Sequence, residues 1–225
     1  AANLETLRRQ LLVKIRCLAS QRELRGARGE SSSVPAPVAG AAAGQSSHVA
    51  SAGATAPQSF PPTAVRARST RRFKAIVIGV STGGPKALAC LLPGLCQATS
   101  LPIAIVQHMP PNFTKSLADS LGKQCRHAVA EGADGQALEK GNIYIAPGGQ
   151  HLLLRQTSSR EVVLSLNTQP PENGCRPAVD VLFRSAAAVF GGDVLAMILT
   201  GMGSDGVKGL GPLKRAGAYV IAQDE

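Results

Sequence analysis

The feature that most constrains this chain is a change of pattern at Phe73, after which short apolar runs alternate with stretches of helical periodicity. A short apolar run is typical of a buried strand, and recurrence at every third or fourth position is typical of an amphipathic helix. Strands that alternate with helices build a parallel sheet through right-handed crossovers. We therefore predict an α/β fold: a doubly wound, mostly parallel sheet with helices on both faces and a small antiparallel excursion.

The expected strands cover residues 74–80, 102–107, 193–200 and 218–222, and three short strands within 143–166 are expected to form the antiparallel excursion. The expected helices cover about 85–92, 112–122, 178–190 and 206–216, the second of them with Asn112 as its N-cap.

The first 72 residues lack this alternation. Residues 4–24 carry an amphipathic stripe, so a helix is predicted within residues 1–30. Residues 31–65 contain no charged side chain and are mostly Ala, Ser, Gly and Pro, which cannot build a core, so 31–72 is predicted to be a flexible linker. The folded domain is expected over 73–225, incomplete at its C-terminal end because the chain stops directly after a strand.

The formal net charge of +10 lies mainly outside this domain. Residues 1–72 hold eleven basic and three acidic side chains, whereas the rest of the chain holds thirteen basic and eleven acidic ones. A nucleic-acid-binding domain carries its excess positive charge on the folded surface. We therefore expect no nucleic-acid partner.

The cysteines and the apolar runs indicate the compartment. The five cysteines include no C-x-x-C pair, which argues against a disulfide framework or a thiolate metal site. No apolar run is long enough to cross a bilayer. A reducing cytoplasm, without membrane insertion, fits best.

Ser81 stands in a G-x-S-x-G motif, at residues 79–83, that follows an apolar strand and precedes a helix. This context is the one in which a sharp turn exposes a nucleophilic serine. A turn that only reverses the chain, or one that holds a phosphate, would have a similar sequence. The loop lacks the downstream Lys-Ser/Thr of a P-loop and the glycine spacing of a dinucleotide site.

His108 ends the next strand, directly before Met109 and two prolines. The carboxyl ends of parallel strands meet at one edge of a sheet, so His108 and Ser81 are expected to lie side by side there. A histidine that merely caps a strand is the alternative. The other three histidines, at 48, 127 and 151, lack this placement.

Asp205 lies in a glycine-rich loop after the strand over 193–200, at the same edge. A carboxylate there can accept the Nδ1–H of a histidine and stabilise its charged form. Its alternative role is to cap the following helix. Asp180 lies inside a helical pattern and Asp193 begins a strand at the opposite edge, so Asp205 is the expected partner of His108.

Five blocks of this sequence resemble the catalytic domain of chemotaxis protein-glutamate methylesterases: VIGVSTGGP, IVQHMPPNFT, YIAPGGQHLLL, RPAVDVLFRSAA and ILTGMGSDG. The resemblance implies that Ser81 is the nucleophile, His108 the base and Asp205 the orienting acid. It also implies that backbone N–H groups of Thr82 and Met202 bind the oxyanion. No metal or organic cofactor is expected.

The resemblance further implies a substrate and partners. The substrate would be methylated glutamates on the cytoplasmic helices of chemoreceptors, with glutamine deamidation as a second activity. An upstream histidine kinase would act through a receiver domain, and the helix over 4–24 resembles the end of that domain; the receiver itself is either absent or encoded upstream. Two other functions stay open, a phosphate-binding module that uses residues 79–84 and a catalytically silent scaffold.

Overall fold

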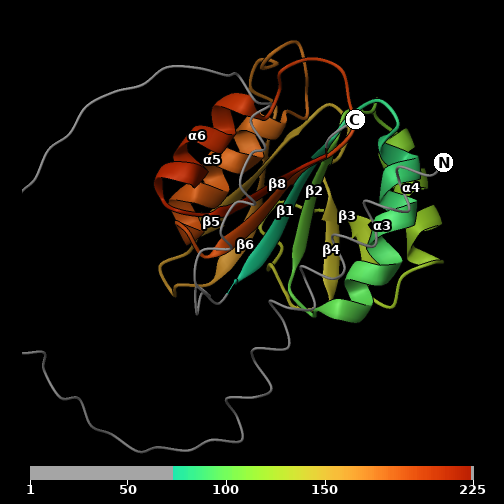
Figure 1. The fold of residues 1–225 in the computed structure, drawn as a ribbon, viewed down its shortest axis with the longest axis horizontal. Coiled ribbons are helices and arrows are strands. Elements are labelled where there is room, and N and C mark those ends of the chain that lie inside the picture. The colour runs from blue at the N-terminus through green and yellow to red at the C-terminus, as the bar shows by residue number, and fades with distance from the viewer. Residues whose placement is uncertain (1–72, 224–225) are drawn as a thin grey trace, which may run out of the picture.

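The computed structural model describes residues 73–223. The helix expected within 1–30 and the linker expected over 31–72 lie outside these residues. Within them, six parallel strands form one sheet in the order β3-β4-β2-β1-β7-β8 (Figure 1). Their bounds are β1 Ala75–Val80, β2 Ile103–Gln107, β3 Ala128–Glu131, β4 Asn142–Ile145, β7 Val194–Ile198 and β8 Tyr219–Ala222.

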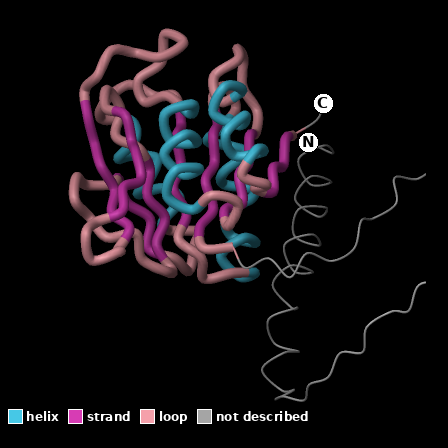
Figure 2. Tube along the Cα trace, turned by 90° about the vertical axis from the view of Figure 1, so that its left-hand side faces the viewer, coloured by secondary structure: helices cyan, strands magenta, loops and turns pink. Residues whose placement is uncertain are grey.

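Helices cover both faces of this sheet. Helices α3 (Gly84–Ala98) and α4 (Phe113–Gly122) pack on one face. Helices α5 (Val179–Phe190) and α6 (Val207–Arg215) pack on the other, together with an antiparallel pair formed by β5 (His151–Gln156) and β6 (Val162–Asn167) (Figures 1 and 2). The predicted α/β class, with a doubly wound sheet and an antiparallel excursion, is confirmed.

Strand β1 shows why the chain needs two helical layers. Its side chains alternate between the faces, with Ile76 and Ile78 in the core under α3 and Ala75 and Val77 in the core under α5. All six β1 residues are buried. A strand buried on both faces is apolar throughout, and burying each large aliphatic side chain contributes about 1.5–3 kcal/mol.

Two expectations for the sheet were wrong. Residues 142–147 were expected in the antiparallel excursion, but β4 pairs in parallel with both β2 and β3 in the main sheet. Its apolar residues Ile143 and Tyr144 are buried on opposite faces, which suits an interior strand. Strand β3 was not predicted because it is a short edge strand with half of its residues exposed.

Of two expectations at helix ends, one was wrong and one was confirmed in position only. Helix α3 continues through Pro93 to Ala98 instead of stopping near residue 92. Burial of Leu95 and Cys96 against the sheet holds the last turns in place despite the proline. Asn112 occupies the N-cap position of α4, but its backbone is left-handed (φ 74°) and its side chain makes no capping hydrogen bond.

The strand order reverses beside β1. The chain runs from β1 to β2 on one side, and later returns to place β7 on the other side of β1. Open α/β sheets bind ligands outside the carboxyl ends of their strands at such a reversal. The loops after β1, β2 and β7 lie at the upper end of the sheet in Figure 1.

No helix among residues 73–223 has the length and apolar character that a membrane span requires.

Candidate active site

Ser81 lies directly after β1, where the backbone turns sharply into α3. Its N–H donates to the carbonyl of Thr200 at 2.9 Å, and its carbonyl accepts from the N–H of Gly84 at 2.9 Å. Gly84 is buried, and a Cβ there would collide with the side-chain oxygen of Gln107. A Cβ on Gly201, in the loop after β7, would lie 2.7 Å from the Cβ of Ser81. Because Gly84 and Gly201 have no side chain, the start of α3, the end of β2 and the loop after β7 can pack closely around Ser81.

His108 lies directly after β2, the strand next to β1. Its N–H donates to the carbonyl of Val80 at 3.2 Å, which fixes the two strand ends against each other. The Nδ1 atom of the His108 ring lies 3.0 Å from Oγ of Ser81. The histidine side chain is mostly buried, with 17% of its area exposed.

Asp205 completes a chain of hydrogen bonds from the loop after β7. Its Oδ2 atom lies 2.7 Å from Nε2 of His108 and accepts from the N–H of Val179 at 2.7 Å. Its Oδ1 atom accepts from the N–H of Asp180 at 3.1 Å and from the side-chain amide of Asn173 at 3.0 Å. Because Val179 and Asp180 begin α5, the carboxylate also lies at the positive end of a helix dipole.

These donors decide the charge of Asp205. Burial by itself would raise the pKa of the carboxyl group. The hydrogen bonds from His108, from the N–H groups of Val179 and Asp180, and from Asn173 outweigh burial and hold the pKa below its usual value. Asp205 is therefore an anion at neutral pH, which fixes a proton on the facing nitrogen of His108.

The ring of His108 is oriented opposite to the sequence-based expectation. We expected Asp205 to accept from Nδ1, but Nε2 faces Asp205 and Nδ1 faces Ser81. The strand order explains this: β1, with Ser81, lies between β2 and β7. The nitrogen nearer the histidine backbone meets Ser81, and only the far nitrogen reaches the loop after β7.

Gln107 joins the serine to the histidine, and sequence reasoning missed it. Its side-chain amide donates to the carbonyl of Ser81 and to the carbonyl of His108, both at 3.0 Å. The residue is 2% exposed, and its Oε1 atom has no hydrogen-bond partner among the described residues. A polar residue at the end of an otherwise apolar strand, directly before His108, was the available signal.

A second missed group, Asn173 and Asp180, stands behind Asp205. The amide of Asn173 donates to Asp180 at 2.8 Å as well as to Asp205, so one nitrogen bridges two carboxylates. Asp180 is fully buried and also accepts from the N–H of Gly209 at the start of α6. Asp180 makes no hydrogen bond with His108, in keeping with its rejection as the histidine's partner, but it belongs to the network that holds Asp205.

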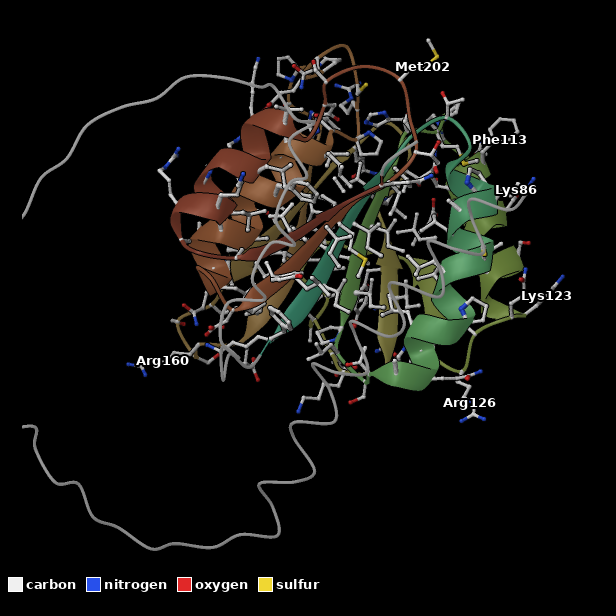
Figure 3. All side chains as sticks on the ribbon, in the orientation of Figure 1. Lys86, Phe113, Lys123, Arg126, Arg160 and Met202 are labelled. Atoms are coloured by element: carbon white, nitrogen blue, oxygen red, sulfur yellow. The ribbon has the colours of Figure 1, made fainter. Side chains whose placement is uncertain are left out.

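The expected oxyanion donors, Thr82 and Met202, lie on the two loops that meet at Ser81. Within residues 73–223, the N–H groups of both residues have no hydrogen-bond partner. The Met202 side chain is 83% exposed and extends outward at the upper end of the sheet in Figure 3. Free donors beside a serine are what a developing negative charge on a substrate oxygen requires.

The residues that were set aside lie elsewhere. Asp193 pairs with Lys74 at 3.1 Å, at the amino ends of β7 and β1. His151 is buried, and its ring bridges the carbonyl of Pro170 and the N–H of Ala178. His127 lies directly before β3, and its buried Nδ1 has no hydrogen-bond partner within residues 73–223. Burial lowers the pKa of this histidine.

Cys175 is an unexpected neighbour of the histidine. Its Sγ atom lies 3.7 Å from Nδ1 of His108. Burial raises the pKa of this thiol, and the carboxylate of Asp205 raises it further. The thiol therefore stays protonated near neutral pH, and it does not compete with Ser81 as a nucleophile.

The chain is similar to several known proteins. Residues 76–225 match the family model described as CheB methylesterase. A protein-glutamate methylesterase/protein-glutamine glutaminase of Desulfotalea psychrophila is 50% identical over 161 residues, which cover 70% of this chain and 44% of the relative. A protein-glutamate methylesterase/protein-glutamine glutaminase of group 2 operon from Bradyrhizobium diazoefficiens is 41% identical over 230 residues, covering 100% of this chain and 57% of the relative.

A solved structure is also similar to this chain. The CheB methylesterase catalytic domain of Thermotoga maritima superposes with a TM-score of 0.64 at 44% sequence identity, covering 67% of this chain and 79% of that one. The chain spans about half the length of the curated relatives it matches.

Proposed function

Because this chain belongs to the CheB methylesterase family, we propose that it hydrolyses methyl esters of glutamate side chains on a protein substrate. Ser81 is the nucleophile, His108 the general base and Asp205 the acid that orients the histidine. The observation that carries the proposal is the continuous line of hydrogen bonds from Ser81 Oγ through the His108 ring to Asp205.

The first half of the reaction follows from the orientation of the ring. With a proton held on Nε2 by Asp205, the lone pair of Nδ1 is free to take the hydroxyl proton of Ser81. Oγ attacks the γ-carbonyl carbon of the glutamyl ester, and the carbonyl oxygen becomes an oxyanion. The charged imidazole then gives its proton to the departing methoxy oxygen, so methanol leaves and the glutamyl group remains esterified to Ser81.

The second half repeats these steps with water. Nδ1 takes a proton from a water molecule, the resulting hydroxide attacks the acyl group, and the proton returns to Oγ of Ser81. The product is a free glutamate side chain. A glutamine side chain offers the same carbonyl with ammonia as the leaving group, so deamidation is the natural second activity.

The N–H groups of Thr82 and Met202 are the proposed oxyanion donors. Both lie on loops that enclose Ser81, and both lack a partner among the described residues. Removing one such donor costs about 3–4 kcal/mol of transition-state stabilisation in comparable enzymes.

The two other functions have less support. A phosphate-binding loop at residues 79–84 does not account for the histidine and carboxylate that follow the Ser81 hydroxyl in a chain of two hydrogen bonds. A catalytically silent scaffold does not account for an oriented histidine with a free Nδ1 lone pair. The methylesterase function accounts for both features.

The substrate and partners are proposed on the same basis. Methylated cytoplasmic helices of chemoreceptors are the substrate that fits, and a receiver domain controlled by a histidine kinase is the regulator. The cytoplasm is the corresponding compartment. In this arrangement the receiver controls access to the edge of the sheet that carries Ser81.

A serine-directed fluorophosphonate probe tests the proposal. The probe should label the wild-type chain at Ser81, because attack on phosphorus needs the same activated hydroxyl. Mass spectrometry of the labelled peptide identifies the residue. A chain that binds inorganic phosphate but takes no label would favour the phosphate-binding alternative, and a chain that does neither would favour the scaffold.

A further inference from the structure

Cys175 has no part in the proposed reaction, yet its thiol lies against the reactive nitrogen of His108. The Sγ atom is 3.7 Å from Nδ1, and Oγ of Ser81 is 3.0 Å from the same nitrogen. The thiol is held there by a tight turn in which Glu172 and Cys175 exchange backbone hydrogen bonds at 3.1 and 2.8 Å. Sulfur, imidazole nitrogen and hydroxyl oxygen thus converge from three separate segments.

The orientation of His108 leaves Nδ1 available as a ligand. Asp205 accepts the proton of Nε2 at 2.7 Å, so the lone pair is on Nδ1 and faces Cys175 and Ser81. Histidines that bind metals are typically oriented in this way, by a carboxylate that accepts from the nitrogen opposite the metal. Asp205 itself is engaged by Val179, Asp180 and Asn173, so it acts through the ring.

The spacing of the sulfur and the nitrogen matches the tetrahedral coordination of an ion such as Zn²⁺. With Zn–S of about 2.3 Å, Zn–N of about 2.1 Å and a tetrahedral angle, the two ligand atoms lie about 3.6 Å apart. The distance in the structure is 3.7 Å. The potential ligand atoms of His108, Cys175 and Asp205 all lie within 4.8 Å of one another.

We propose that Nδ1 of His108 and the thiolate of Cys175 form an inhibitory site for a thiophilic divalent cation such as Zn²⁺. Ser81 Oγ or a water molecule supplies a third ligand. On binding, the thiol releases its proton to water, S–Zn and N–Zn bonds form, and the ion loses hydrating water molecules.

Inhibition follows from the lone pair that the ion occupies, and this part of the inference rests on the proposed function. Once Nδ1 is bound to the metal, it cannot take a proton from Ser81. Mg²⁺ and Ca²⁺ prefer oxygen ligands and bind this sulfur–nitrogen pair poorly, so they should not inhibit. The site would make the enzyme sensitive to free zinc.

A spectroscopic experiment tests the site without any turnover. Co²⁺ added to the full chain should produce the near-ultraviolet absorption of a thiolate-to-cobalt charge transfer. The Cys175→Ala variant should lose this band. Cys125→Ser is the matched control: this cysteine lies next to Arg126, at the end of the molecule opposite Met202 in Figure 3, and the band should persist. A band of equal strength in Cys175→Ala would overturn the site.

A kinetic experiment tests its effect. Each variant's methanol release is measured over a series of buffered Zn²⁺ concentrations and is normalised to its own metal-free rate. Removing a direct ligand should raise the half-inhibitory Zn²⁺ concentration by about tenfold or more, since loss of even an outer-shell partner costs about 10–100-fold in affinity. Equal zinc sensitivity in wild type and Cys175→Ala would contradict the proposal. If the chain had no esterase activity, the cobalt spectrum would still decide whether the site exists.

Discussion

Asp205 meets His108 through the far nitrogen of the ring, with Oδ2 and Nε2 2.7 Å apart, and this contact sets the direction of proton transfer at Ser81. The carboxylate is itself held by the first N–H groups of α5. The start of α5 therefore positions Asp205, Asp205 orients His108, and His108 presents Nδ1 to the serine.

Asp205→Asn should reduce kcat about ten thousand-fold, by analogy with the same change in other triads. Each Asp205 oxygen accepts from one N–H group of α5, so the N–H₂ of an asparagine faces a backbone donor in either rotamer: that of Val179, beside His108, or that of Asp180. Methanol release from a methylated receptor fragment measures the loss. A variant that kept a tenth of the wild-type rate would show that the acid does not orient the base.

The carboxylate of Asp205 should also make the stability of the fold depend on pH. Since the pKa of Asp205 is lower in the folded chain than its ordinary value near 4, folding gains stability from it at any pH above that ordinary value. This stability is lost as the pH falls from about 4 through the lower, folded pKa. Urea unfolding of wild type and Asp205→Asn between pH 6 and pH 2 should show that acid lowers the free energy of unfolding less in the variant. An equal dependence of this free energy on pH in both proteins would contradict the lowered pKa of Asp205.

Asn173→Gly should weaken the support of Asp205 without straining the backbone. Asn173 has a left-handed backbone (φ 51°), which glycine adopts freely, so the variant removes the bridging amide and adds only the entropy that glycine gives the unfolded chain. Two carboxylates lose a donor, and we expect about 2–3 kcal/mol lower stability and an earlier onset of acid unfolding.

The comparison variant Asn173→Ala should be less stable than Asn173→Gly, because alanine adds the cost of a left-handed backbone. Chemical denaturation measures both. Equal stability of wild type and Asn173→Gly would mean that the amide bridge contributes nothing.

Much of the site follows from the sequence because it depends on strand ends. An apolar run followed by a glycine-rich or proline-rich turn marks where β1, β2 and β7 stop, and in a parallel sheet these ends share one edge. Ser81, His108 and Asp205 were chosen on this ground, and the structure places them within hydrogen-bond distance.

The missed features depend on contacts between distant segments. The orientation of the His108 ring follows from the strand order, which periodicity does not specify. The pairing of β4 with β2 and β3 was missed for the same reason. Asn173 lies in an irregular turn, and only the folded chain shows that its amide reaches two carboxylates.

Gln107 offers a test of how the serine and the histidine are held together. Gln107→Met should cost about 1 kcal/mol, because the carbonyls of Ser81 and His108 lose a donor but the unpartnered Oε1 is removed as well. Gln107→Glu should cost more, since it brings a buried carboxyl group against two carbonyl oxygens. Thermal unfolding ranks the variants. Equal stability of Gln107→Glu and Gln107→Met would contradict the hydrogen bonds from Gln107 to the two carbonyls.

Gly201→Ala should displace Ser81 by a steric clash. The new Cβ would lie 2.7 Å from the Cβ of Ser81, so Ser81 or the loop after β7 must move, and kcat should fall by about a hundredfold. Gly122→Ala, at the end of α4, is the matched control, because the new Cβ would meet nothing nearer than the Cβ of Val129 at 3.8 Å, an ordinary contact. Activity of Gly201→Ala equal to that of the control would show that this contact does not position the nucleophile.

Methanol release from a methylated receptor fragment, by wild type and by Ser81→Ala, tests the central claim most directly. Ser116, an exposed serine of α4, supplies the control: Ser116→Ala should match wild type. We predict that Ser81→Ala loses about a million-fold in kcat while its unfolding curve stays close to that of wild type. Release of methanol by Ser81→Ala at the wild-type rate would contradict the account.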